Sequence, residues 1–121
     1  MMYDDSDEGR MEAAEHLADQ SVAAAAEAFS AIACDDSVGD EVRLAAAEQL
    51  AALDPRRAGS ACLAIARDEG VGDEVRLSAA ELVAEVDPRA AAPACIAIVA
   101  DHAVGDEVRR SAAQHLANVV F

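Results

Sequence analysis

The sequence predicts an all-α protein, an α-solenoid of helical hairpins with about seven helices. The first observation is a hexapeptide, Val-Gly-Asp-Glu-Val-Arg, which begins at Val38 and returns unchanged at Val71 and Val104. Its copies lie 33 residues apart (71 − 38 and 104 − 71), and a fixed period of about 20 to 50 residues is typical of a stacked array. The second is that no stretch alternates apolar and polar residues as a half-buried strand would. Together they favour helices stacked along one axis.

The period also sets the domain organisation. Residues 38–70 align without a gap to residues 71–103, with 20 identities in 33 positions. A shift of one period towards the N-terminus places a diverged copy before residue 38, with Gly9 where the later units have Val. The sequence therefore predicts an acidic N-terminal tail, residues 1–7, and a single repeat domain, residues 8–121, with units 8–37, 38–70 and 71–103 and a half unit 104–121.

Each unit is expected to hold two helices. The first begins at Asp40 in the second unit, because Asp is a good N-cap and Glu41 suits the positive end of the helix dipole. The second begins at Asp54-Pro55, because proline fits the first helical position, where its missing N–H has no partner. Ser21 is the expected cap of the corresponding helix in the first unit. The same starts are expected at Asp73, Asp87 and Asp106.

The helix that opens each unit resembles the HEAT-like repeats, an α-solenoid family. The resemblance rests on an opening Asp, a Val-Arg pair, paired alanines and a leucine, which stand here as Asp40-Glu41-Val42-Arg43-Leu44-Ala45-Ala46-Ala47-Glu48-Gln49-Leu50. It covers nearly the whole chain and implies that the Val-Arg helices line an inner, concave face. It also implies one polar ladder along the turns, made by Asp40, Asp73 and Asp106 with Arg43, Arg76 and Arg109. It implies no particular function.

Charge narrows the choice of partner. The formal net charge is −15, from 24 acidic and nine basic residues, and all nine basic residues are Arg. Few cations are left for phosphate contacts, so the composition argues against nucleic-acid binding. A basic protein partner is the simplest functional interpretation. The alternative is that acidity serves solubility and keeps copies apart.

A candidate partner-binding surface follows from the helical period. At 100° per residue, Val42, Ala46 and Leu50 face the core, and glutamates with a row of apolar residues lie on the opposite, inner side. This surface suits a helix or extended segment with basic and apolar residues. The alternative is that Leu44 and Leu77 pack against neighbouring helices. The candidate residues are Glu8, Met11, Glu15, Glu41, Leu44, Glu48, Glu74, Leu77, Glu81, Glu107 and Arg110.

The C-terminal helix supports a competing hypothesis of self-association. It ends in an apolar run, whereas the ends of repeat arrays normally need a polar outer face. The run can fold back over the last unit or pair with a second copy as a homodimer. The residues concerned are Leu116, Val119, Val120 and Phe121.

The cysteines and histidines do not indicate a reactive site. Cys62 and Cys95 share a repeat position that Phe29 holds in the first unit, which indicates core packing, whereas Cys34 is expected to be more exposed. His16 and His115 share a position that Gln and Leu occupy in the units between. No CxxC or Cys/His spacing for zinc is present. We therefore expect no metal and no cofactor.

Enzymatic activity is not expected either. Deoxyhypusine hydroxylases, a HEAT-like family, bind two irons through His-Glu pairs, and this chain contains none. The phycobilin lyases are similar only through the general repeat. No nucleophile triad or phosphate-binding glycine loop appears. The prediction is a non-enzymatic binding module or accessory subunit, with a HEAT-like enzyme or lyase accessory as the weaker alternative.

The ends of the chain predict a cytoplasmic protein. The N-terminus is acidic, whereas a secretory signal starts with basic residues and an apolar run. The longest uncharged run, residues 90–100, contains Pro93 and is too short for a membrane span. The sequence therefore predicts no membrane association.

Overall fold

The structure, a computed structural model, describes residues 6–120, with side chains to residue 118. Seven α-helices and no strand occur in this range, which confirms the predicted all-α class. Their bounds are α1 (Asp7–Ala18), α2 (Val22–Ala33), α3 (Asp40–Leu53), α4 (Pro55–Arg67), α5 (Asp73–Val86), α6 (Pro88–Ala100) and α7 (Asp106–Val120). The first helix thus begins at Asp7, one residue before the boundary expected from the sequence.

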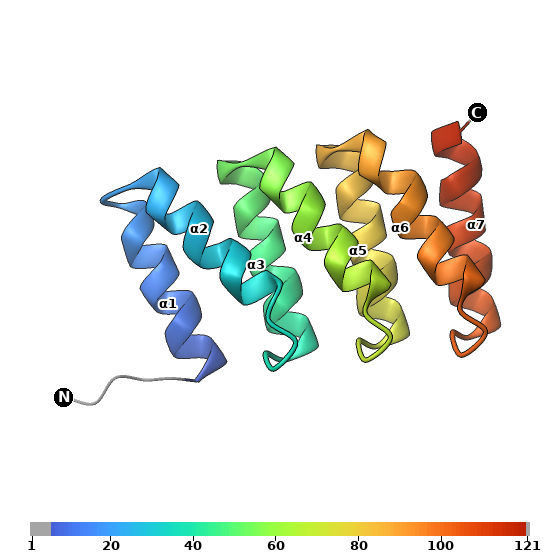
Figure 1. Ribbon diagram of the computed structural model, residues 1–121, viewed down its shortest axis with the longest axis horizontal. Helices are drawn as coiled ribbons and strands as arrows, with labels where there is room; N and C mark the ends of the chain where they lie inside the picture. Colours follow the sequence, from blue (N-terminus) through green and yellow to red (C-terminus); the bar gives the residue numbers. More distant parts are fainter. Residues whose placement is uncertain (1–5, 121) are drawn as a thin grey trace.

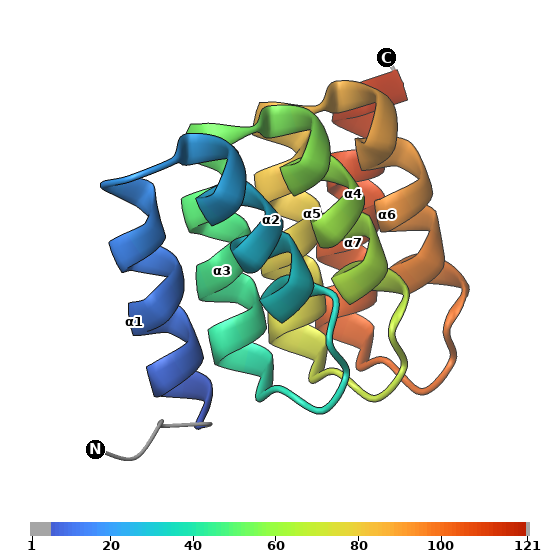
Figure 2. The same cartoon turned by 60° about the vertical axis from the view of Figure 1, so that its left-hand side comes forward.

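The helices lie in two layers. Figure 1 shows α1, α3, α5 and α7 side by side in one layer and α2, α4 and α6 crossing in front of them. Figure 2 shows the same two layers obliquely, with the turns that precede α3, α5 and α7 along one edge. In the described range, each helix packs only against helices one or two places away along the chain. Contacts are therefore local, and each hairpin depends on its neighbours.

Local sequence explains where the helices of the second layer begin. The Ser21 hydroxyl accepts a hydrogen bond from the Ala24 N–H at 3.2 Å, and the Asp54 carboxylate accepts one from the Arg57 N–H at 3.3 Å. Both predicted caps are confirmed, and Pro55 occupies the first turn of α4. Asp87 holds the N-cap position of α6 but its side chain makes no capping bond.

The predicted aspartate N-caps of α3 and α5 are wrong, although both helices begin where the sequence predicted. The N-caps of α3 and α5 are Gly39 and Gly72, and neither helix has a side-chain capping bond. Asp40 and Asp73 are the first residues inside these helices. Their carboxylates instead accept hydrogen bonds from the next unit, from the N–H groups of Gly72 and Gly105.

The core is built from small side chains between the two layers. Its largest fully buried members include Phe29, Leu50 and Ile65, and most of the rest are alanines. The first valine of each hexapeptide copy, at Val38, Val71 and Val104, is buried, whereas the second is only half-buried. Each alanine removes little apolar area from water, at about 25 cal/mol per Å². Stability therefore depends on polar contacts between units as well as on packing.

No helix in the described range combines the length and the apolar character that crossing a bilayer requires.

Candidate functional site

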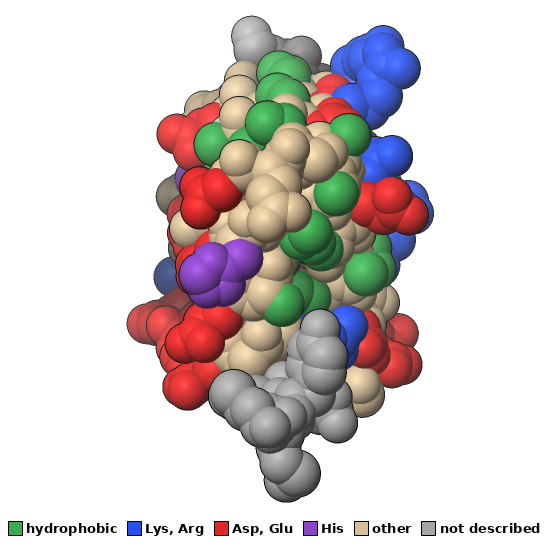
Figure 3. Space-filling view, turned by 90° about the vertical axis from the view of Figure 1, so that its left-hand side faces the viewer, with side chains coloured by type: hydrophobic (Ala, Val, Ile, Leu, Met, Phe, Trp, Pro, Cys, Tyr) green, Lys and Arg blue, Asp and Glu red, His purple; other side chains and the backbone are tan. Residues whose placement is uncertain are grey.

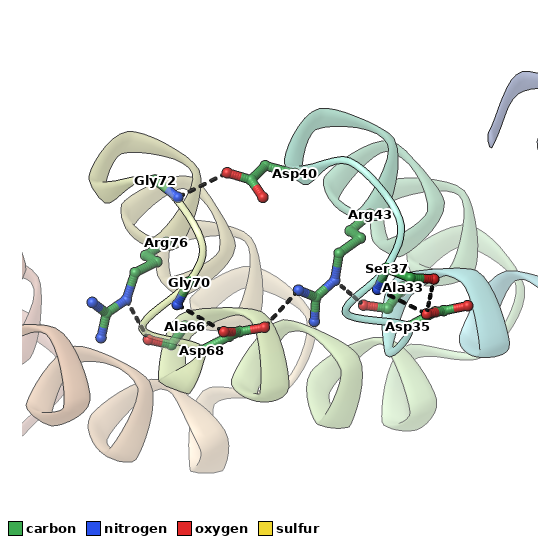
Figure 4. A network of polar contacts seen from close by, with 10 residues as sticks. All are labelled: Ala33, Asp35, Ser37, Asp40, Arg43, Ala66, Asp68, Gly70, Gly72 and Arg76. Atoms are coloured by element: carbon green, nitrogen blue, oxygen red, sulfur yellow. Dashed lines mark hydrogen bonds and ion pairs between the residues drawn. The ribbon is translucent and has the colours of Figure 1, made fainter. Parts of the chain in front are cut away.

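A ladder of arginine–aspartate pairs joins successive units. Its arginines lie on first-layer helices, and its aspartates lie in the turns that follow the second-layer helices. The buried Arg43 guanidinium donates from Nη1 to Asp68 at 2.8 Å and from Nε to the Ala33 carbonyl at 2.9 Å (Figure 4). One arginine thus holds the end of α2 and the turn after α4. Equivalent Nη1 bonds join Arg10 to Asp35 at 2.8 Å and Arg76 to Asp101 at 2.7 Å.

The aspartates of this ladder are held in place by their own turns. Asp68 also accepts from the Gly70 N–H at 2.9 Å, and Asp35 accepts from the Ser37 hydroxyl and N–H. These bonds and the arginines keep the pKa of Asp35, Asp68 and Asp101 below the usual range of a carboxyl group. The three carboxylates are consequently ionised at neutral pH.

A second ladder runs along the start of the first-layer helices. The Asp40 carboxylate accepts a hydrogen bond from the Gly72 N–H, one unit further on, at 2.8 Å (Figure 4). Asp7 and Gly39, and Asp73 and Gly105, repeat this bond at 2.9 Å. The nearly equal lengths show that the three junctions share one geometry.

The resemblance implied one ladder, and the structure has two. Asp40 does not pair with Arg43, because the aspartate reaches the following glycine while the arginine reaches back to α2 and on to Asp68. The arginine partners Asp35, Asp68 and Asp101 were missed. A signal for them existed, since they too recur every 33 residues.

Asp106 and Arg109, from the last copy of the hexapeptide, make fewer side-chain contacts than their equivalents in the earlier copies. Within the described residues, the Arg109 side chain donates only to the Val99 carbonyl, at 3.1 Å, and the Asp106 carboxylate has no hydrogen-bonded partner.

The regular junctions leave a groove across the N-terminal ends of α3, α5 and α7. Its carboxylates are Glu41, Glu74 and Glu107, one from each helix, with Asp73 and Asp106. Its volume is about 770 Å³, and no basic residue lines it. Val75, Val108, Gly72 and Gly105 complete the lining.

A second hollow of about 350 Å³ continues from this groove between α5 and α7. It shares Glu74, Glu107 and Val108 with the first. It adds Leu77, Ser78, Glu81 and Ser111. We call the residues of both hollows together the acidic groove.

The acidic groove contains only part of the predicted surface. It brings together Glu41, Glu74, Leu77, Glu81 and Glu107. The remaining candidates lie outside its lining, on α1, α3 and α7. They are Glu8, Met11, Glu15, Leu44, Glu48 and Arg110. The three glutamates and Arg110 are exposed.

The predicted apolar row packs largely against the core. Met11, Leu44 and Leu77 are half-buried and pack against the core, as the alternative interpretation held. Only Leu77 also lines the groove. The predicted continuous apolar row across three units is therefore reduced to one leucine within the acidic groove.

Two kinds of groove residue escaped the sequence argument. Asp73 and Asp106 had been given a purely structural role, and the equivalents of Val42 had been placed in the core. Val75 and Val108 are instead half-buried and form apolar lining of the groove. A helical wheel assigns a residue to a side of the helix, but the exposure of a first-turn residue depends on how closely the next unit approaches.

The charge of the groove is uncompensated. Glu41, Glu74 and Glu107 are exposed, and their side chains have no hydrogen-bonding or ion-pair partner within the described range. Glu81 does have one, His115 Nε2 of α7 at 2.9 Å. Figure 3, seen from the α1 end, shows acidic side chains on both the left and the right flank, with arginines gathered at the upper right.

Burial makes two of the cysteines unreactive. Cys62 and Cys95 are buried as predicted, and Cys34 is exposed. Desolvation, followed by the charge of Glu48, raises the pKa of Cys62 to about 12, and desolvation likewise raises that of Cys95. A thiol with so high a pKa holds almost no thiolate at neutral pH. No group of three or more His, Cys, Asp or Glu side chains in the described range is placed to hold a metal ion.

Most residues of the self-association hypothesis have side chains that the structure does not describe. Leu116 is half-buried and packs against the core. The side chains of Val119 and Val120, and the whole of Phe121, lie outside the described part of the chain. Association through this run stays a prediction.

Comparison with known proteins gives no family assignment. No protein family, no curated protein and no solved structure matches this chain. Function must therefore be argued from the acidic groove itself.

Proposed function

We propose that the protein is a HEAT-like α-solenoid that acts as a non-enzymatic binding module and receives a basic or amphipathic protein segment in its acidic groove. The observation that carries the proposal is a row of three exposed, unpaired glutamates from three successive units. Glu41, Glu74 and Glu107 line one groove with no basic residue among its lining. Val75 and Val108 supply apolar contact between them.

Helix stabilisation explains part of this arrangement but not all of it. An acidic residue in the first turn favours the helix dipole by about 0.3 to 1 kcal/mol. Asp40, Asp73 and Asp106 already supply such a charge to α3, α5 and α7. A second carboxylate in each first turn adds repulsion within a chain whose net charge is −15. A cationic partner relieves that repulsion.

The proposal is tested with a basic amphipathic peptide of Lys and Leu as the probe, titrated at low ionic strength. The triple variant Glu41→Gln, Glu74→Gln, Glu107→Gln removes the row without changing side-chain size. Exposed ion pairs contribute about 0.2 to 1 kcal/mol each. Their joint loss is therefore expected to weaken binding roughly tenfold, as measured by fluorescence anisotropy.

A matched control separates the groove from bulk charge. Asp36→Asn, Glu27→Gln and Glu69→Gln change the net charge equally at exposed positions outside the groove lining. This variant is expected to bind within about twofold of the parent protein. Equal weakening in both variants would show that only the overall charge matters, and the proposed site would be wrong.

A further inference from the structure

We infer that one side of α7 is a docking surface for a helix of another protein, and that this helix is followed by an aspartate that Arg109 holds. The inference concerns a surface other than the acidic groove and goes beyond the proposed function. It comes from comparing α7 with α1, α3 and α5, each of which packs against the second-layer helix that follows it. Within the described range α7 contacts only α5 and α6, and it stands at the end of the row in Figure 1.

Two neighbouring alanine positions show which side of a first-layer helix the following helices cover. The first position is exposed in α1, at Ala13, and buried in α7, at Ala112. The second is buried in α1, at Ala14, and exposed in α7, at Ala113. In the described range α1 packs only against α2 and α3, which follow it, so the second position is the one that following helices cover. Ala113 therefore marks the side of α7 that is covered in the earlier units.

This side of α7 carries three further residues that are covered in α5. We call Arg109, Ala113, Leu116 and Ala117 the open face of α7. Each of them is more exposed than its equivalent in α5, and these equivalents are Arg76, Ala80, Val83 and Ala84. Side chains that form an interface between helices in α5 are thus available for contact in α7.

Arg109 is oriented to bind a carboxylate. Its Nε donates to the Val99 carbonyl at 3.1 Å, as the Nε of Arg76 donates to the Ala66 carbonyl at 2.8 Å. With its Nε held in this way, Arg76 donates from Nη1 to Asp101, the residue after α6. The Nη atoms of Arg109 have no partner among the described residues. A carboxylate placed as Asp101 is would complete a charge-assisted hydrogen bond.

The second-layer helices show what kind of helix fits beside such a face. They share alanines at i and i+3, a larger apolar residue at i+4, isoleucine at i+7 and aspartate at i+10. In α4 and its turn these are Ala58, Ala61, Cys62, Ile65 and Asp68, and in α6 and its turn they are Ala91, Ala94, Cys95, Ile98 and Asp101. All the apolar members of the two sets are buried. The partner helix is expected to carry the same pattern.

The occupant is a different protein rather than a second copy of this chain. The helices of this chain that carry the pattern are α2, α4 and α6. The aspartates after them are already bound to Arg10, Arg43 and Arg76. A second copy would have to break one of these pairs to supply the helix.

The test uses a fluorescein-labelled peptide with the sequence of residues 54–71, which contains α4 and Asp68, added to the intact protein in reducing buffer. Fluorescence anisotropy is expected to show binding with a Kd below about 1 mM. Asp68→Asn in the peptide should weaken binding about five- to twentyfold, because it removes a charged acceptor. General attraction to a protein of net charge −15 predicts the opposite, since the Asn peptide is the more positive one.

Two changes in the protein assign the binding to the open face. Arg109→Gln should weaken binding of the parent peptide and should be non-additive with Asp68→Asn by about fivefold. Ala113→Glu places a charge at an exposed position, so the fold is kept while binding is expected to fall more than about tenfold. Arg56→Gln is the control for charge, because Arg56 is exposed on α4, which does not contact α7. It should bind within about twofold of the parent protein.

The outcomes separate this inference from its alternatives. Absence of binding at about 1 mM, tighter binding of the Asn peptide, or an additive cycle at Arg109 overturns it. Light scattering on the protein alone adds a further arm. Association with rising concentration that Ala113→Glu abolishes would mean that a second copy covers the open face, and the inference would be wrong. The groove triple variant should bind the peptide as the parent does, so failure here leaves the proposed function untouched.

Discussion

The first rung of the arginine ladder and the two that follow have the same bond but different surroundings. Arg10, Arg43 and Arg76 donate to their aspartates at 2.8, 2.8 and 2.7 Å. The side chain of Arg10 is 34% exposed, whereas those of Arg43 and Arg76 are 3% and 2% exposed. Judged by distance alone, the three pairs should stabilise the fold equally. Because their burial differs, their contributions to stability are expected to differ.

The difference arises because the inner arginines lie between two hairpins. Arg43 and Arg76 also donate from Nε to the last carbonyls of α2 and α4. Arg10 has no such bond in the described range, where α1 is the first helix. Removing an inner arginine therefore leaves a helix-end carbonyl without its side-chain donor, and it leaves a half-buried carboxylate with only the N–H bond from its own turn.

The largest expected effect comes from replacing an inner arginine. Arg76→Ala is expected to lower the free energy of unfolding by about 3 to 5 kcal/mol, because breaking a buried pair from one side leaves unmatched polar groups. Arg43→Ala should behave alike. Arg10→Ala should cost less than about 1 kcal/mol, as for an exposed pair. Urea denaturation followed by circular dichroism measures all three.

Arg89→Ala is the matched control for loss of one positive charge, because Arg89 is 85% exposed and its nearest carboxylate oxygen, on Asp87, is 3.7 Å away. It is expected to change stability by less than about 0.5 kcal/mol. A cost for Arg10→Ala as large as that for Arg76→Ala would refute the argument from burial.

The ladder of aspartates and glycines sharpens the comparison, because its three hydrogen bonds do not differ in burial. All three are exposed hydrogen bonds of 2.8 to 2.9 Å. Asp7→Ala, Asp40→Ala and Asp73→Ala are therefore expected to cost about 1 to 2 kcal/mol each, from the loss of one hydrogen bond and of a favourable helix-dipole term. Urea midpoints of the three variants should agree closely.

Asp106→Ala isolates the hydrogen bond from the dipole. Asp106 stands in the first turn of α7 but makes no such bond within the described range. Its replacement should cost about 1 kcal/mol less than that of Asp40. Identical costs at the two positions would mean that the bond to the following glycine contributes nothing measurable.

Much of the fold could be predicted because its information is local. The capping residues Ser21 and Asp54 and the proline at the start of α4 each act within a few residues of the chain. The burial of Cys62 and Cys95 was predictable from Phe29 at the same repeat position. Periodicity identifies equivalent residues, and equivalent residues have equivalent surroundings.

Partners across units could not be predicted in the same way. Arg43 binds Asp68, 25 residues on, and Asp40 binds Gly72, 32 residues on. The period identifies both sets of residues but not which of them meet, because that depends on the direction in which each turn approaches its neighbour. The acidic groove is bounded by the same turns. The sequence could therefore identify its glutamates but not the lining valines.

The pH dependence of stability gives the finest test of the inner rungs. Asp68 and Asp101 have a lowered pKa in the folded state, chiefly through their hydrogen bonds from Arg43 and Arg76. A depressed folded pKa contributes stability that is full above the unfolded value, about 3.9, and is lost as pH falls towards the folded pKa. Loss of negative charge on acidification acts oppositely, because it relieves repulsion in a chain of net charge −15.

Urea midpoints between pH 7 and pH 2.5 should therefore rise on mild acidification and fall again below about pH 4. The double variant Asp68→Asn, Asp101→Asn should start lower at pH 7 and show a shallower fall, because the ladder carboxylates that bind protons on unfolding are gone. Asp36→Asn with Glu69→Gln, which removes two exposed carboxylates outside this ladder, should keep the full acid limb. If the limb were unchanged without Asp68 and Asp101, the inner rungs would not be the source of acid sensitivity, and burial of their arginines would have no bearing on it.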